Sequence, residues 1–156
     1  METVKLVRLQ MVKERSVVFD GGSLKSPGEA ARLVRRILDD TDREQFVVLA
    51  LNTKNHVVGA NIASVGSLNS SIVHPREIFK FACLANAAAV ILAHNHPSGD
   101  PEPSPEDREM TRRLIEAGRV LGIDVLDHVI LGDPDYRDHW SFCEQTSMFD
   151  PSAKPA

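Results

Sequence analysis

The chain has 156 residues, of which 42% are hydrophobic, so it is long enough for one domain with a buried core rather than for two. A total of 18 Lys and Arg against 22 Asp and Glu leaves a formal net charge of −4. An acidic chain gains little from counterion release on duplex DNA, so we expect no strong non-specific nucleic-acid binding. The apolar stretch 81–93 is interrupted by Asn86 and is too short to cross a bilayer, so no membrane partner is expected.

The compartment is predicted from the N-terminus and the cysteines. The first residues contain no apolar segment followed by a small-residue cleavage site, so the sequence does not support secretion. Cys83 and Cys143 lie far apart and make no disulfide framework. We therefore expect a cytoplasmic protein. The sequence leaves open whether the chain forms a homodimer.

Residues 1–25 are predicted to be an N-terminal extension of strand and turn. Val4, Leu6 and the run 17–19 favour strand, although other apolar residues of this segment would suit a helix equally well. The glycines of the segment 20–23 predict a turn.

A helix is predicted from Pro27 to about Asp39. Ser26 is a typical N-cap residue, proline follows at the first helical position, and Glu29 lies three residues after the cap. The two β-rich runs 45–51 and 56–63 then predict an antiparallel hairpin with a four-residue loop.

The second half of the chain alternates helix and strand around one irregular segment. The segment 94–107 contains four prolines and a glycine, which favour a constrained loop. The remaining predictions are a helix from Pro75 to about Ala88, a strand at 90–93 buried on both faces, a helix at 105–121 and a strand at 123–131. The sequence therefore predicts one α/β domain at 26–147, followed by a flexible tail at 148–156.

The irregular loop begins with two histidines that suit a metal ion. Residues two apart in an extended segment point the same way, so His94 and His96 can direct both imidazoles at one point. Asp107, at the start of the following helix, is the candidate for the missing carboxylate ligand. Two histidines and one aspartate suit zinc and leave a fourth tetrahedral position open, as in catalytic sites.

Simpler interpretations exist for the same residues. Ser104, Pro105 and the two acids after them have the pattern of a helix start, which needs no metal and is compatible with one. His94-Asn95-His96 also matches the name of a nuclease motif, but three adjacent residues carry little specificity, and the acidic charge balance argues against it.

The complete spacing H-x-H-P-x6-S-x2-D, from His94 to Asp107, resembles the JAMM motif of the JAB/MPN metalloprotease superfamily. Members of that superfamily include zinc isopeptidases that remove ubiquitin-like modifiers. The string HNHPSGDPEPSPED, with REQFVVLALN before it and LDHVIL after it, is most similar to the RadC family of bacterial proteins. The resemblance implies a JAB/MPN-like α/β domain, with a curved mixed β-sheet flanked by helices and a zinc site at a strand end.

The resemblance also implies roles for individual residues. His94, His96 and Asp107 match the ligands of Zn²⁺, and Glu44 matches the glutamate that takes a proton from the zinc-bound water. Ser104 matches the serine whose hydroxyl helps to hold the water and the developing oxyanion. The implied function is a zinc-dependent metallohydrolase, a metallopeptidase that cleaves a peptide or isopeptide bond in a protein or peptide substrate.

Two other functions remain as alternatives. One is a non-catalytic interaction domain that keeps the metal for stability, and the other is a DNA-repair-associated protein, as the history of the RadC name suggests. Asp127 and His128 match a family string without an implied role. Adjacent strand residues face opposite ways, so at most one of them can bond to a metal ligand, and both can equally be buried polar residues satisfied locally.

Overall fold

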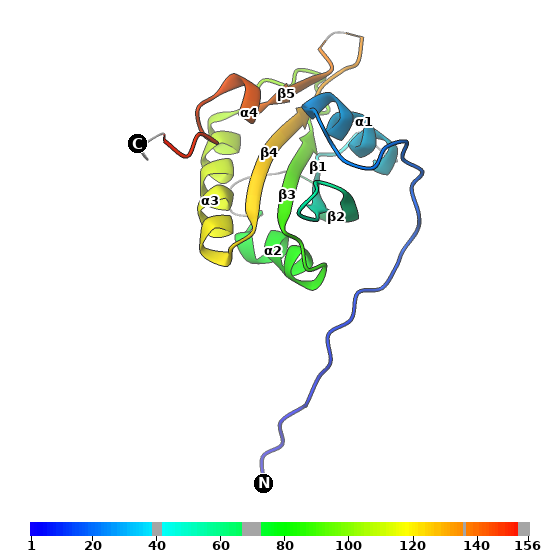
Figure 1. Ribbon diagram of the computed structural model, residues 1–156, viewed down its shortest axis with the longest axis vertical. Helices are drawn as coiled ribbons and strands as arrows, with labels where there is room; N and C mark the ends of the chain where they lie inside the picture. The colour runs from blue at the N-terminus through cyan, green and yellow to red at the C-terminus, as the bar shows by residue number, and fades with distance from the viewer. Residues whose placement is uncertain (39–41, 67–72, 136, 153–156) are drawn as a thin grey trace.

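Five strands pair in the order β2-β1-β3-β4-β5 in the computed structural model, which describes residues 1–38, 42–66, 73–135 and 137–152 (Figure 1). The β3 and β4 strands are parallel, and the other neighbours are antiparallel. The elements are α1 (Pro27–Ile37), β1 (Gln45–Leu51), β2 (Val57–Val65), α2 (Pro75–Leu84), β3 (Ala89–Asn95), α3 (Pro105–Leu121), β4 (Asp124–Leu131), β5 (His139–Ser141) and α4 (Phe142–Gln145). The single α/β domain with a mixed sheet is as predicted.

Helices cover both faces of the sheet (Figure 1). On one face, α1 packs its buried side chains, among them Val34, against sheet residues such as Leu49. On the other face, α2 and α3 pack against the alternate sheet residues, with Leu114 of α3 in the same cluster as Val48. The central strands β1 and β3 are therefore buried along their whole length, which explains their continuous apolar sequences.

The helix boundaries follow from their caps. Ser26 and Ser104 each accept a hydrogen bond from a backbone N–H of the first turn of α1 and α3, and each helix has proline next to its cap. Gly122 ends α3 at φ 72°, in the left-handed region that favours glycine. The predicted bounds of α3 are confirmed, whereas the last predicted residues of α1 include Asp39, which lies outside the described residues.

The α2 helix ends at Leu84, four residues before the predicted end. Asn86 has φ 51°, and the chain closes around it with two hydrogen bonds. The N–H of Asn86 donates to the carbonyl of Cys83 at 3.1 Å, and the N–H of Ala87 donates to that of Ala82 at 3.0 Å. This is a Schellman ending, and it turns the chain directly into β3.

The β3 strand continues two residues into the segment that was predicted to be a loop, because both neighbouring strands extend beside it. His94 pairs with Phe46 of β1, and Asn95 pairs with Leu131 of β4. The Asn95 side chain also bonds to β1, accepting from the N–H of Gln45 at 2.8 Å. The first histidine of the motif is thus held rigidly in a sheet.

The β4 strand contains a β-bulge that decides which side chains face α3. Val125 and Asp127 pair with consecutive residues of β3, so Leu126 is the extra residue. Val125 packs with α2 and α3, but Val129, four residues further on, packs with α1. The bulge therefore reverses the alternation and turns His128 toward α3.

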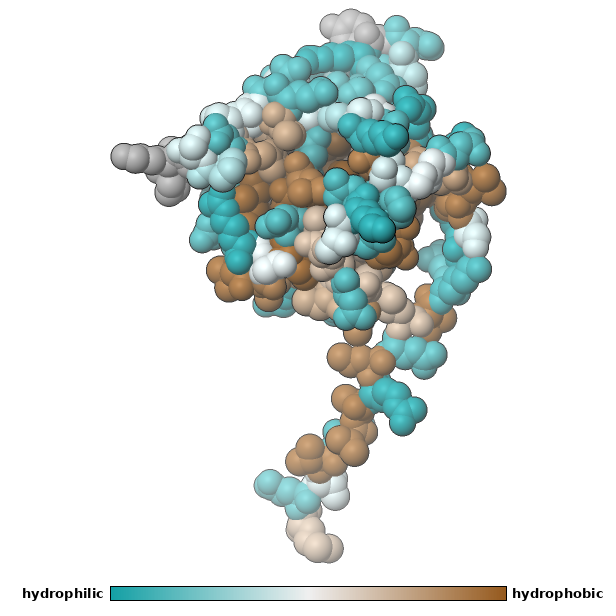
Figure 2. Space-filling model, viewed as in Figure 1, coloured by the Kyte–Doolittle hydropathy of each residue, from teal (hydrophilic) through white to brown (hydrophobic). Residues whose placement is uncertain are grey.

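The predicted strand in the N-terminal extension is wrong. Residues 1–19 have no strand or helix. In Figure 1 the first part of this segment runs away from the domain as an extended chain, whereas Val17 and Phe19 at its end pack against the cluster that contains α1. A strand needs a paired neighbour, and the sheet forms without this segment. Figure 2 shows apolar side chains along it. Leu6 and Leu9 are among the exposed apolar residues of the chain.

The chain after β4 forms two short elements, β5 and α4, that the sequence analysis did not predict. Asp127 organises this corner: its carboxylate accepts from the N–H of His128 at 2.7 Å, the N–H of Cys143 at 2.9 Å and the hydroxyl of Ser141 at 2.6 Å. Burial raises the pKa of Asp127 above its usual range, although these hydrogen bonds oppose the rise.

Among the described helices, none is long and apolar enough to cross a membrane.

We predict that Gly118→Ala destabilises the protein, although alanine is the better helix former. An added Cβ would lie 2.4 Å from the carbonyl oxygen of Ile123, so α3 would have to move off β4 at a cost of about 1–3 kcal/mol. Gly28→Ala in α1 is the matched control, because its nearest neighbour would be 3.7 Å away. Urea unfolding should show a lower free energy of unfolding for the first variant only, and equal values for the two would contradict the tight packing.

We predict that Asp127→Ala lowers the free energy of unfolding by about 2 kcal/mol or more, because buried donors lose their acceptor. Asp127→Asn keeps an acceptor oxygen and should lose less. The raised folded-state pKa stabilises the parent below the unfolded pKa, and this contribution is lost as pH rises through the folded pKa. Thermal unfolding at several pH values should therefore show the parent losing stability relative to Asp127→Asn as pH rises across that window.

Candidate metal centre

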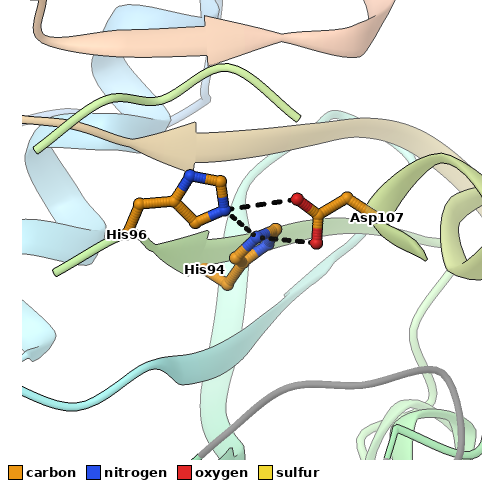
Figure 3. A group of neighbouring side chains, drawn as sticks. All are labelled: His94, His96 and Asp107. Carbon is orange, nitrogen blue, oxygen red and sulfur yellow. Dashed lines mark hydrogen bonds and ion pairs between the residues drawn. The ribbon is translucent and has the colours of Figure 1, made fainter. Parts of the chain in front are cut away.

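His94 and His96 meet at the end of β3. Both imidazoles point toward Asp107 of α3, and their Nε2 atoms lie 3.1 Å apart (Figure 3). His94 is fully buried, whereas the His96 side chain is 15% exposed at the edge of the loop. The predicted convergence of the two rings is therefore present, with one ring in the core and one reaching the surface.

Asp107 brings a carboxylate to the same point from the first turn of α3. One of its oxygens lies 3.3 Å from Nε2 of His94, and the other lies 3.2 Å from Nε2 of His96 (Figure 3). Among the described residues, these three form a group whose ligand atoms all lie within 4.8 Å of one another. The group has the composition and spacing of a site that could hold a metal ion.

The helix-start interpretation of Ser104 to Asp107 is also confirmed. The Asp107 carboxylate accepts from the N–H of Ser104 at 2.9 Å, and the Ser104 hydroxyl oxygen accepts from the N–H of Asp107 at 3.1 Å. This capping box orients the carboxylate without the help of a metal ion. It uses one acceptor of Ser104 and leaves the proton of its hydroxyl available to donate.

The hydrogen bond on the far side of His96 prepares its ring for a metal. Nδ1 of His96 lies 2.8 Å from the carbonyl oxygen of Asp100, and a carbonyl oxygen can only accept. The proton of a neutral ring is therefore on Nδ1, and Nε2 presents a lone pair to His94 and Asp107. A cation between this lone pair and the Asp107 carboxylate would be bound by both, and nitrogen and oxygen ligands of this kind suit zinc.

Charges in the cluster shift two pKa values in opposite directions. Burial acts to raise the pKa of Asp107, but hydrogen bonds with both histidines outweigh it and hold this pKa far below the usual range. Burial acts to lower the pKa of His96, and bonds to Asp107 and to the Asp100 carbonyl outweigh that and raise it. The carboxylate is thus ionised, as a metal ligand must be.

Glu44 lies just before β1 and outside the three-residue group. The next residue, Gln45, donates its N–H to the side-chain oxygen of Asn95 at 2.8 Å, so Glu44 adjoins the end of β1 that is bonded to the end of β3. The Glu44 carboxylate is close enough for its negative charge to contribute to the raised pKa of His96. Its backbone carbonyl accepts from the N–H of Gly66 at 2.8 Å, which ties it to the end of β2.

His128 and Thr111 also belong to the site, and motif reasoning did not assign them a role. His128 is fully buried, and its Nε2 lies 2.8 Å from Nδ1 of His94. Burial holds the pKa of His128 well below its usual range. Of the Asp127-His128 pair, then, it is His128 that bonds to the cluster. Thr111 was missed, although its position four residues after Asp107 places it on the same face of α3.

The chain is similar to known proteins over most of its length. A family model described as RadC-like JAB domain matches residues 24–147. The chain is 57% identical over 110 residues to a UPF0758 protein of Desulforamulus reducens, covering 70% of this chain and 48% of that protein. For a UPF0758 protein of Desulfitobacterium hafniense the identity is 58% over 113 residues, with 72% and 50% covered.

A UPF0758 protein of Rubrobacter xylanophilus is 52% identical over 132 residues, which cover 83% of this chain and 58% of that protein. The chain thus spans about half the length of the curated relatives it matches. Because the family model covers the sheet, its helices and the three-residue group together, the chain belongs to the RadC-like JAB domain family.

Proposed function

We propose that this chain is a zinc-dependent metallohydrolase that cleaves peptide or isopeptide bonds in a protein or peptide substrate of the cytoplasm. The observation that carries the proposal is the convergence of His94, His96 and Asp107, whose ligand atoms lie 3.1–3.3 Å apart. Imidazole nitrogen and carboxylate oxygen are ligands that zinc prefers, and three of them leave a position open for substrate or water.

The polar residues around the cluster fit this chemistry. A zinc ion bound there would polarise the carbonyl of the substrate and lower the pKa of its bound water to about 7. Glu44, whose charge acts on His96, is the proposed acceptor of a proton and its later donor to the leaving amine. Ser104 keeps a hydroxyl proton that it can donate to a developing oxyanion. Such a hydrogen bond lowers the barrier by about 3 kcal/mol.

A groove beside His96 provides room for a substrate. It is lined by the end of β3 and the turn after it, by the turn after β4 and by α1, including Asn95, Gly99, Gly132 and Arg35. His96 is a member of this lining, so an extended chain in the groove would pass the exposed side of the cluster. This favours a polymeric substrate such as a peptide.

We predict that His96→Ala and Asp107→Asn each lose zinc, because each removes one of three ligands. Metal analysis of the purified proteins should find about one zinc per chain in the parent and much less in both variants. His56→Ala, at an exposed histidine of the β1–β2 turn, is the control and should keep its zinc. Equal zinc contents in all four proteins would refute the ligand assignment.

We predict that Glu44→Gln keeps its zinc and loses cleavage of a peptide library by about 10²-fold or more, since the proton acceptor is removed. Mass spectrometry of the library measures the cleavage. Glu102→Gln is a matched control, because Glu102 lies on the exposed part of the loop. If Glu44→Gln cleaves like the parent, the proposed role of Glu44 is wrong.

Chelation separates this function from a zinc ion kept only for stability. Removal of the metal should abolish cleavage and shift the melting temperature little, because the domain has two apolar clusters that do not involve the metal. Global unfolding on chelation would instead support the structural alternative.

A further inference from the structure

A line of hydrogen bonds leaves the cluster from His94 and returns to it at Asp107. Nδ1 of His94 lies 2.8 Å from Nε2 of His128, and Nδ1 of His128 lies 2.6 Å from Oγ1 of Thr111. The Thr111 hydroxyl in turn donates to the backbone carbonyl of Asp107 at 2.6 Å. His94, His128 and Thr111 are all 0% exposed, so no solvent competes for these bonds.

The direction of every bond in this line follows from its last member. A carbonyl oxygen only accepts, so the single hydroxyl proton of Thr111 is committed to Asp107. Oγ1 of Thr111 can then only accept from His128, which places the proton of His128 on Nδ1. A neutral imidazole carries one N–H, so Nε2 of His128 accepts, and the proton it accepts is the one on Nδ1 of His94.

Aromatic packing holds the rings in this arrangement. Phe142 stacks on His128 with centroids 5.2 Å apart and planes 14° apart, and Phe46 contacts the same ring at 5.4 Å. Phe46 also stacks on His94 at 6.0 Å and 10°. The two imidazoles are therefore packed between aromatic rings, which fix their orientation and with it the hydrogen-bond partners of their nitrogens.

We infer that His128 and Thr111 are positioning residues that keep the proton of His94 on Nδ1, so that Nε2 presents a lone pair to a divalent cation. The cation rests on the proposed function, whereas the location of the proton rests on the hydrogen bonds alone. His96 reaches the same state by a different route, through the carbonyl of Asp100. Both histidines are thus prepared for the metal by groups on the side away from it.

The Thr111 hydroxyl provides the test, because it can be removed without changing the shape of the side chain. Thr111→Val deletes the hydroxyl and frees His128 to turn its N–H toward His94, so that His94 can carry its proton on either nitrogen. Thr111→Ser keeps the hydroxyl. The matched control is Thr146→Val, because Thr146 also donates to the carbonyl four residues before it, that of Phe142 at 2.7 Å, in α4.

Competition with a chromophoric chelator measures the zinc dissociation constant of each protein. We expect Thr111→Val to bind zinc about tenfold more weakly than the parent, with Thr111→Ser and Thr146→Val within about twofold of it. Thermal unfolding of the metal-free proteins shows whether each variant folds. An equal loss in Thr111→Ser and Thr111→Val, or no loss in Thr111→Val, would overturn the inference.

Nitrogen NMR of the histidine rings in the metal-free protein shows which ring nitrogen of His94 carries the proton. We expect the ring proton of His94 on Nδ1 in the parent and in Thr111→Ser, and distributed over both nitrogens in Thr111→Val. A parent that carries this proton on Nε2 overturns the inference, whatever the variants do. If the parent binds no zinc, the proposed metallohydrolase function fails, and this readout still decides the role of His128 and Thr111.

Discussion

The carboxylate of Asp107 is the group on which both the start of α3 and the candidate metal centre depend. It accepts the backbone N–H of Ser104, and it faces the Nε2 atoms of His94 and His96. A buried carboxylate costs several kcal/mol unless such partners compensate it. The capping box and the two imidazoles supply that compensation together, so the way α3 packs on the sheet also sets the geometry of the cluster.

The cluster has two unlike sides. On the inner side, His94 is fully buried and is bonded through His128 and Thr111 to the helix that carries Asp107. On the outer side, His96 borders the groove, and its Nδ1 is bonded to the carbonyl of Asp100 in the loop. The rigid side fixes the position of the ligands, and the outer side provides the access that an incoming substrate requires.

Elements with local signals were predictable, and those fixed by distant pairing were not. The caps of α1 and α3 can be read from Ser26 and Ser104, and the trio of His94, His96 and Asp107 from its spacing. By contrast, the nearness of Glu44 to His96 depends on the pairing of β1 with β3, which no local pattern encodes, and only the family resemblance indicated it. The bond between His128 and His94 likewise depends on a bulge that sequence alternation does not reveal.

That bulge lets β4 lose one residue without changing which of its side chains face α3. Leu126 is the residue without a partner on β3, so its deletion would leave Val125 opposite Val90 and Asp127 opposite Ile91, with His128 still directed toward α3. A residue added between Asp127 and His128, with Asp127 kept opposite Ile91, would instead turn the imidazole away from α3 and break its bond to His94. In a library of variants, this stretch should therefore accept deletion of the Leu126 codon far more readily than insertion of a codon after Asp127.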